Sequence, residues 1–319
     1  MPSLKDLRNR IKTVKSTERI TSAMKMVAAA KLKKSEHRVA ELRPFAEKME
    51  EMLSQLSADT KTNDGGDAPP LLVGRHEKQH SSAKKILLLV ITSDRGLCGG
   101  FNGAMVKSVR KEIHALEAKH HSIRLMVVGR KGVGLLKRDL QKLFIAEFEE
   151  LCKPAPNFDS AEMVAQQIIT LFNNGEIDEC QLFFSKYVSA LTQIVTPLSL
   201  IPFQTSNNTA NKSSDSKTDN TTHEKTKTDN QTSDKILTEF EPNEEAILQK
   251  LLPQNLAVQI YRGFLESFAS EQGARMTAMD NATRNAKELI NKLTITYNRS
   301  RQAQITKELI EIISGAEAI

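Results

Sequence analysis

The stretch LKDLRNRIKTV, residues 4–14, begins the apolar pattern that decides the fold of this chain. Its apolar residues are spaced alternately by three and four, and the same spacing continues as far as Leu56. Of the 16 positions in this heptad seam, 12 are apolar. A repeat of this period predicts one long helix over residues 3–57 that packs against another helix. Pro44 lies inside the pattern and should bend this helix.

Four polar residues interrupt the seam, and they are Glu18, Thr21, Lys25 and Ser35. Close to them, Ile20, Met24 and Val27 form a neighbouring apolar line. We therefore expect the seam to move to another face of the helix within the Ala-rich stretch 26–32, where small side chains allow close helix contact.

The C-terminal third carries a second heptad pattern. From Leu251 to Ile310, 12 of 18 seam positions are apolar, which predicts another long helix. Glu241-Pro242-Asn243 is a plausible start, and Pro253 should separate a short first segment. Gly315 lies where a C-terminal cap is expected, and Gly273, Gln272 and Arg275 interrupt the apolar stripe.

The lengths of these two helices restrict how the chain can fold. Helices of some 55 and 60 residues would be roughly 80 and 90 Å long, whereas a compact globule of this size has a diameter of about 50 Å. Both helices must therefore protrude, and neither buries its apolar stripe alone. We expect them to pair as a long antiparallel coiled coil of the N- and C-terminal helices.

The sequence between the helices alternates strands with helices. Strand patterns occur at 85–92, 123–128, 143–148, 180–188 and 193–203, and helical patterns at 103–120, 131–140 and 159–174. This alternation predicts a small Rossmann-like α/β domain with a largely parallel sheet and helices on both faces. The fold class is thus α+α/β.

Composition divides the chain further. We expect an N-terminal coiled-coil helix at 1–58, a linker at 59–83, the α/β domain at 84–203 and the C-terminal coiled-coil helix at 236–319. Between the last two lies the segment 204–235, whose only apolar residue is Ala210. A segment that can bury no apolar surface is expected to be a disordered low-complexity insert.

Charge and hydropathy exclude several classes of protein. The longest apolar run, residues 86–91, is far too short for a membrane span, which excludes an integral membrane protein. Three widely spaced cysteines predict neither a zinc site nor a disulfide framework.

The net charge is +6, and residues 1–48 hold 13 Lys and Arg against 5 Asp and Glu. This basic arm suits nucleic acid, an acidic membrane face or an acidic protein partner.

Two glycine-rich turns leave an enzyme as an alternative. The turn SDRGLCGGFN, residues 93–102, follows a strand and precedes a helix, as a dinucleotide site would, but its glycines lack the G-x-G-x-x-G spacing. GRKGVG, residues 129–134, has no matching acidic residue after it. Cys98 has no histidine placed to act as its base. Tight strand-to-helix turns explain both segments better. A dinucleotide-binding α/β enzyme and a basic coiled-coil nucleic-acid-binding protein remain the two alternatives.

Three motifs together resemble a known family. They are ITSAMKMVAAAK at 20–31, SDRGLCGG at 93–100, and the C-terminal block that includes SEQGARM at 270–276, MDNAT at 279–283 and YNRSRQ at 297–302. These motifs, in this order, resemble the gamma subunit of the F-type (F1Fo) ATP synthase. The insert at 204–235 departs from the pattern of that family.

The resemblance implies a central rotor stalk that couples rotation of the membrane c ring to conformational change in a hexamer of alpha and beta subunits. The expected partners are the alpha, beta and epsilon subunits and the c ring. No catalytic residue, cofactor, metal or nucleic acid is implied for this chain.

Matching the motifs residue by residue implies contacts with the catalytic subunits at Met24, Lys25, Arg275, Gln302, Thr306 and Glu308. It also implies a c-ring contact at Glu241. The apolar end, with Ile310, Ile312, Ile313 and Ala316, would turn within an apolar sleeve of the hexamer. The start at Met1-Pro2 suggests a bacterial protein, held peripherally on the cytoplasmic side of the cell inner membrane.

Overall fold

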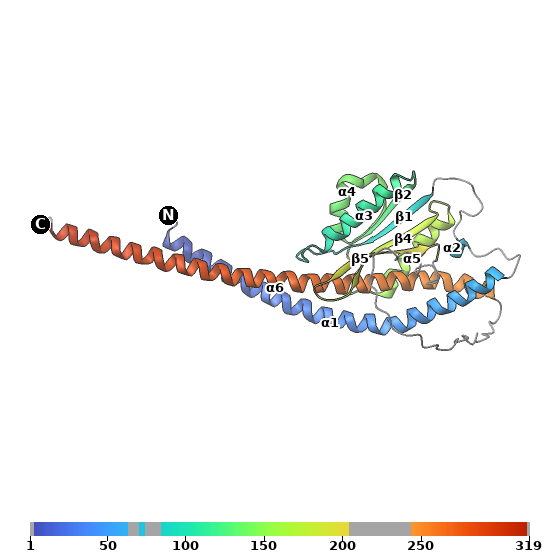
Figure 1. Ribbon diagram of the computed structural model, residues 1–319, viewed down its shortest axis with the longest axis horizontal. Coiled ribbons are helices and arrows are strands. Elements are labelled where there is room, and N and C mark those ends of the chain that lie inside the picture. Colours follow the sequence, from blue (N-terminus) through green and yellow to red (C-terminus); the bar gives the residue numbers. More distant parts are fainter. Residues whose placement is uncertain (1–2, 63–69, 74–83, 204–243, 318–319) are drawn as a thin grey trace, which may run out of the picture.

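Two long helices form a rod that extends well beyond the rest of the protein (Figure 1). The computed structural model describes residues 3–62, 70–73, 84–203 and 244–317. Helix α1 spans Leu4–Thr62 and helix α6 spans Glu244–Glu317. They run antiparallel and place both ends of the chain at the same end of the rod. The predicted coiled coil of the N- and C-terminal helices is confirmed.

A five-stranded sheet lies beside the other end of the rod. The strands are β1 (Lys85–Ile91), β2 (Ser122–Val128), β3 (Phe144–Phe148), β4 (Glu179–Tyr187) and β5 (Gln193–Ile201). Their order is β3-β2-β1-β4-β5, and only the β4–β5 pairing is antiparallel. The largely parallel sheet predicted from the alternating pattern is therefore confirmed.

Helices cover both faces of this sheet because β1 is apolar at every residue after Lys85. Alternate residues Ile86, Leu88 and Val90 point into a core formed with α3 (Phe101–Glu117) and α4 (Arg130–Leu140). The others, including Leu87 and Leu89, enter a second core. A strand buried on both faces needs such a continuous apolar run.

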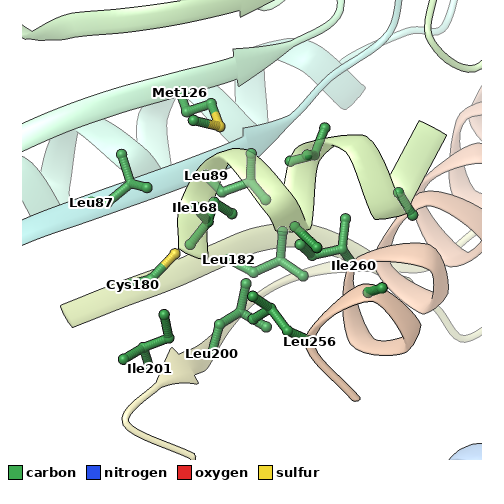
Figure 2. Packing of buried hydrophobic residues seen from close by; sticks show 14 of the residues in the cluster. Leu87, Leu89, Met126, Ile168, Cys180, Leu182, Leu200, Ile201, Leu256 and Ile260 are labelled. Carbon is green, nitrogen blue, oxygen red and sulfur yellow. The ribbon is translucent and has the colours of Figure 1, made fainter. Parts of the chain in front are cut away.

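The second core joins the domain to the rod. Figure 2 shows Leu87, Leu89 and Leu182 of the sheet packed with Ile168 of α5 (Phe158–Asn173) and with Ile260 of α6. Helix α6 therefore belongs to both parts of the molecule, since the same helix covers the sheet and pairs with α1.

The end of β4 holds the rod through polar contacts as well. The Ser185 N–H donates to Ser267 Oγ at 3.1 Å, and Ser270 Oγ donates to the Ser185 carbonyl at 2.9 Å. The Tyr187 hydroxyl donates to Glu36 of α1 at 2.6 Å. The domain is thus fixed to both helices.

Helix α1 is longer, and α6 is more continuous, than the sequence pattern predicted. Helix α1 continues to Thr62, five residues past the predicted end, and α6 passes through Pro253 without a break. Gly315 does not cap α6, which ends at Glu317. Proline removes one backbone hydrogen bond, but near Pro253 the buried Leu252, Leu256 and Ala257 hold the helix against its neighbours.

The segment predicted as a linker is partly helical. A short helix, α2, spans Pro70–Val73, and its Leu72 packs into an apolar cluster with Leu53 of α1 and Leu248 of α6. Residues 63–69 and 74–83 of that segment lie outside the described residues, as do the predicted insert 204–235 and the predicted helix start at 241–243.

Gly263 marks a close approach of α6 to the sheet. A Cβ atom there would lie 2.8 Å from Leu182 Cδ2 and 3.1 Å from Ile91 Cδ1. We expect Gly263→Val to destabilise the protein by about 1–3 kcal/mol, because the added methyl groups overpack this contact. Thermal unfolding followed by circular dichroism would measure the change.

Gly134 of α4 offers the matched control, since nothing lies within 4 Å of its added Cβ. Gly134→Ala should be neutral or stabilising, because alanine favours a helix over glycine. Equal melting temperatures for Gly263→Val and the unsubstituted chain would contradict the close packing of α6.

Candidate functional site

The polar residues that interrupt the α1 seam pair with polar residues of α6. Thr21 Oγ1 and Thr283 Oγ1 lie 2.8 Å apart and are buried. Lys25 Nζ lies 2.6 Å from Asp280 Oδ1, and Glu18 Oε1 lies 3.9 Å from Lys287 Nζ. We call these three pairs the polar ladder. A slip of one helix past the other would separate all three pairs together, so the ladder specifies the register.

The predicted move of the seam to another face is wrong. Thr21 stays in the interface with 8% of its surface exposed, whereas Ile20 and Val27 are 59% and 57% exposed. The four interruptions remain in the seam because α6 supplies a hydrogen-bonding or charged partner to three of them, and Ser35 Oγ donates to the Lys31 carbonyl at 2.9 Å. Buried polar groups are tolerated when they are paired.

Met24 and Lys25 lie at the edge of this interface. Both are partly exposed, and the Lys25 side chain retains 45% of its surface while it pairs with Asp280. The hydrogen bond from Lys25 lowers the pKa of the Asp280 carboxyl below its ordinary value. Lys25 can therefore still present positive charge outward.

Arg275 lies inside the protein. Its guanidinium pairs with Glu271 at 2.6 Å and reaches the carbonyls of Arg95 and Gly96 at 3.5 and 3.4 Å, with 10% of the side chain exposed. Burial raises the pKa of the Glu271 carboxyl, while the charge of Arg275 acts in the opposite direction. Arg275, which interrupts the apolar stripe of α6, therefore links α6 to the glycine-rich turn.

The glycine-rich turn 93–102 is a packed structural element. The Ser93 N–H donates to Asn102 Oδ1 at 3.1 Å, and Asn102 Nδ2 donates to Cys98 Sγ at 3.3 Å. Cys98 is 2% exposed and contacts Ala274 of α6. A buried thiol with no basic side chain among its hydrogen-bond partners in the described chain lacks the arrangement of a catalytic nucleophile.

The position for a phosphate at the start of α4 is already filled by a side chain. Asp94 Oδ1 accepts hydrogen bonds from the backbone N–H groups of Arg130 and Glu150, each at 3.1 Å. Added Cβ atoms at Gly129 or Gly132 would lie 2.3 Å from atoms of Thr92. These glycines therefore allow a strand and a helix to approach closely, and the carboxylate takes the place that a dinucleotide phosphate would need.

The tip of α6 extends past the start of α1 (Figure 1). Residues 301–315, which we call the overhang, are all exposed. Gln302, Thr306 and Glu308 make hydrogen bonds only within the helix in the described chain, from Thr306 to the Gln302 carbonyl and from Gln304 to Glu308. Five large apolar side chains are at least half exposed there, and they are Ile305, Leu309, Ile310, Ile312 and Ile313.

The structure brings Met24, Lys25 and Arg275 to the middle of the rod and leaves Gln302, Thr306 and Glu308 together on the overhang. Glu241, the predicted c-ring contact, lies outside the described residues. Sequence reasoning missed Asp280 and Thr283. Neither residue is a seam position of the α6 heptad, so the sequence pattern alone did not identify them as partners of Lys25 and Thr21.

Within the described ranges, no group of three or more His, Cys, Asp or Glu side chains could hold a metal ion. None of the described helices contains an apolar stretch that could span a lipid bilayer.

We expect Lys25→Met to lower the melting temperature at neutral pH, because it removes the 2.6 Å ion pair with Asp280 and leaves that carboxylate the longer contact with Arg284 at 3.5 Å. The pKa of Asp280 is lowered in the folded protein, so the stability from this pair is present above the ordinary value of 3.8 and is lost as pH falls through the lowered value. The difference between the two proteins should therefore stay constant from neutral pH to about pH 4 and shrink below about pH 4.

Melting curves followed by circular dichroism would test this, with Lys292→Met as the control, because Lys292 is exposed and forms no ion pair in the described chain. A difference that does not shrink in acid would show that Asp280 is not the group involved.

Comparison with known proteins places this architecture in a family. The ATP synthase family model (ATP-synt) matches residues 3–319. The ATP synthase gamma chain of Rhodospirillum rubrum is 46% identical over 319 residues, and that of Paramagnetospirillum magneticum is 48% identical over 320, each covering the whole of both chains.

Solved structures agree with this result. A chain from the central stalk and c-ring structure of the Tetrahymena thermophila mitochondrial ATP synthase has a TM-score of 0.55 at 28% identity, covering 82% of this chain and 99% of its own. A Euglena gracilis mitochondrial ATP synthase chain has a TM-score of 0.62 at 19% identity, covering 99% and 94%, and supports the fold alone. The chain belongs to the ATP synthase gamma-chain family.

Proposed function

We propose that this chain is the central rotor stalk of a proton-translocating ATP synthase and is itself a non-catalytic subunit. It would couple rotation of a membrane ring of c subunits to conformational change in a hexamer of alpha and beta subunits. The observation that carries this proposal is the rod, a pair of unlike helices that ends in an exposed apolar overhang. Exposed apolar surface of this extent indicates a surrounding partner.

The rod is asymmetric because its two helices differ in sequence. A shaft of this kind presents a different face to each surrounding catalytic subunit. It can bias a neighbour only through contacts that differ in energy between the neighbour's states. Moving such an equilibrium from mostly open to mostly closed takes roughly 5.5 kcal/mol, so several contacts must act together.

We propose contacts with the catalytic subunits at two positions along the rod, its middle and the overhang. Met24 and Lys25 are partly exposed at mid-rod, where positive charge would meet acidic loops of the beta subunits. Arg275 would act from inside, by holding the turn that carries the exposed Arg95. Gln302, Thr306 and Glu308 would meet the hexamer from the overhang.

The apolar residues of the overhang suit rotation. Ile310, Ile312 and Ile313 are exposed and offer no directional bonds that would resist turning inside an apolar sleeve. Ala316 belongs to the same predicted surface.

The other proposed partners are an epsilon subunit and the c ring, with Glu241 as a c-ring contact. The chain would be attached peripherally to the cytoplasmic side of a bacterial inner membrane through this complex. We also propose that the chain is divided into two coiled-coil helices, a linker, an α/β domain and an insert.

The two alternatives have less support. Asp94 fills the phosphate position that a dinucleotide enzyme of this fold would use. A nucleic-acid-binding role would rest on the basic arm alone, and it predicts affinity that falls steeply with salt.

Purification of the complex from native membranes would test the proposal. We expect this chain to co-purify with two larger nucleotide-binding subunits present in three copies each. A chain recovered without such partners, under conditions that keep the hexamer assembled, would contradict a rotor role.

Reversal of charge at Lys25 tests the mid-rod contact. We expect Lys25→Glu to weaken the coupling between ATP hydrolysis and proton movement, with assembly preserved. Measurement of both rates on membrane vesicles would quantify the coupling.

Because Lys25→Glu also disrupts the pair with Asp280, the charge swap Lys25→Glu with Asp280→Lys is the necessary control. The swap restores an ion pair within the rod but leaves a carboxylate at position 25. Coupling that stays weak in the swap supports an outward contact from Lys25. Full recovery would assign the effect to the pair within the rod and remove Lys25 from the contacts.

A further inference from the structure

A large cavity lies where the carboxyl ends of β1 and β2 meet the two long helices. Its volume is about 960 Å³, and its lining includes Ala28 of α1, Thr92 after β1, and Phe264 and Phe268 of α6. We call it the sheet-edge cavity. Small-molecule sites have volumes of about 300–1,000 Å³, and open α/β sheets bind ligands outside the carboxyl ends of their strands.

The charge of the lining is strongly positive. Two carboxylates, Asp94 and Glu271, line the cavity together with six cationic side chains, which are Lys31, Arg95, Arg130, Lys131, Lys153 and Arg275. Asp94 accepts two backbone hydrogen bonds and Glu271 pairs with Arg275, so both carboxylates are compensated.

Four of the cations are available to a ligand. Lys153 pairs with Glu150, and Arg275 pairs with Glu271. The side chains of Lys31, Arg95, Arg130 and Lys131 form no ion pair or hydrogen bond with the described part of the chain. The aliphatic part of Lys131 lies against Gly96, where an added Cβ would be 3.7 Å from Lys131 Cε. These four charges surround one opening, which suits a ligand with several negative charges.

Gln272 places a hydrogen-bonding amide in the lining of the cavity. This residue is 3% exposed, lines the cavity and makes no side-chain hydrogen bond within the described ranges. Its amide atoms are not shut into the core, so they are accessible from the cavity and free to bond a ligand. Phe264 and Phe268 line the same cavity. An amide beside aromatic side chains can recognise a flat ring that carries both a donor and an acceptor.

We propose that the sheet-edge cavity binds a nucleoside diphosphate or a molecule of the same chemistry, a planar hydrogen-bonding ring joined to two or more phosphates. The ring meets Gln272 between apolar walls, and the phosphates meet the four unpaired cations. This mode differs from dinucleotide binding at a helix start, because Asp94 occupies that position of α4. The site lies on this chain alone and does not depend on the proposed rotor function.

Isothermal titration of the full-length chain with ADP, pyrophosphate and adenosine tests the site. We expect saturable binding of ADP, weaker binding of pyrophosphate and the weakest binding of adenosine. Lys131→Ala should weaken ADP binding by about tenfold, the effect of one lost charge-assisted hydrogen bond. Gln272→Met, which keeps the length of the side chain, should weaken ADP binding but leave pyrophosphate binding unchanged.

Lys12→Ala is the matched control, because Lys12 belongs to the basic arm, is exposed and does not line the cavity. Circular dichroism of each variant would verify folding. Absence of saturable ADP binding would overturn the proposal, as would adenosine binding as tight as ADP. If Lys12→Ala and Lys131→Ala weaken ADP affinity equally, the binding belongs to the basic arm instead. If Gln272→Met weakens the affinities for ADP and pyrophosphate equally, Gln272 does not contact the ring of the ligand.

Discussion

The antiparallel packing of α1 along α6 is the interaction on which the rest of this structure depends. Neither helix could bury its apolar stripe alone, and together they form a rod much longer than a compact domain. Apolar contacts between such stripes are tolerant of sliding. The polar ladder formed by Thr21, Lys25 and their partners on α6 removes that tolerance, because it has one register in which its pairs meet.

Helix α6 also makes the rod and the α/β domain mechanically continuous. Its residues Leu256, Ile260 and Phe264 belong to the core beneath the sheet, while Thr283 and Asp280 pair with α1 further along the same helix. The domain is therefore attached through a shared core and through the bond from Tyr187 to Glu36. Rotation of the domain about the rod axis would have to disrupt that core.

Heptad spacing and the alternation of strands and helices were sufficient to predict the architecture, because both patterns reflect which residues are buried. They failed where a polar residue had a partner far away in sequence. In the sequence Thr21 and Lys25 indicate a displaced seam, since nothing near them in the chain identifies Thr283 and Asp280 as their partners. Arg275 likewise interrupts the apolar stripe of α6, and its partners, the carbonyls of Arg95 and Gly96, lie far away in the sequence. The end of α6 was misjudged at Gly315 because glycine permits a cap without requiring one.

The overhang has a further mechanical consequence. Along most of the rod two helices share any twisting or bending strain, but past the start of α1 a single helix carries it. The stiffness of the rod must therefore fall abruptly near residue 301, where α1 no longer runs beside α6. Elastic deformation under torque would concentrate in this last stretch, which makes the tip the compliant element of an otherwise rigid shaft.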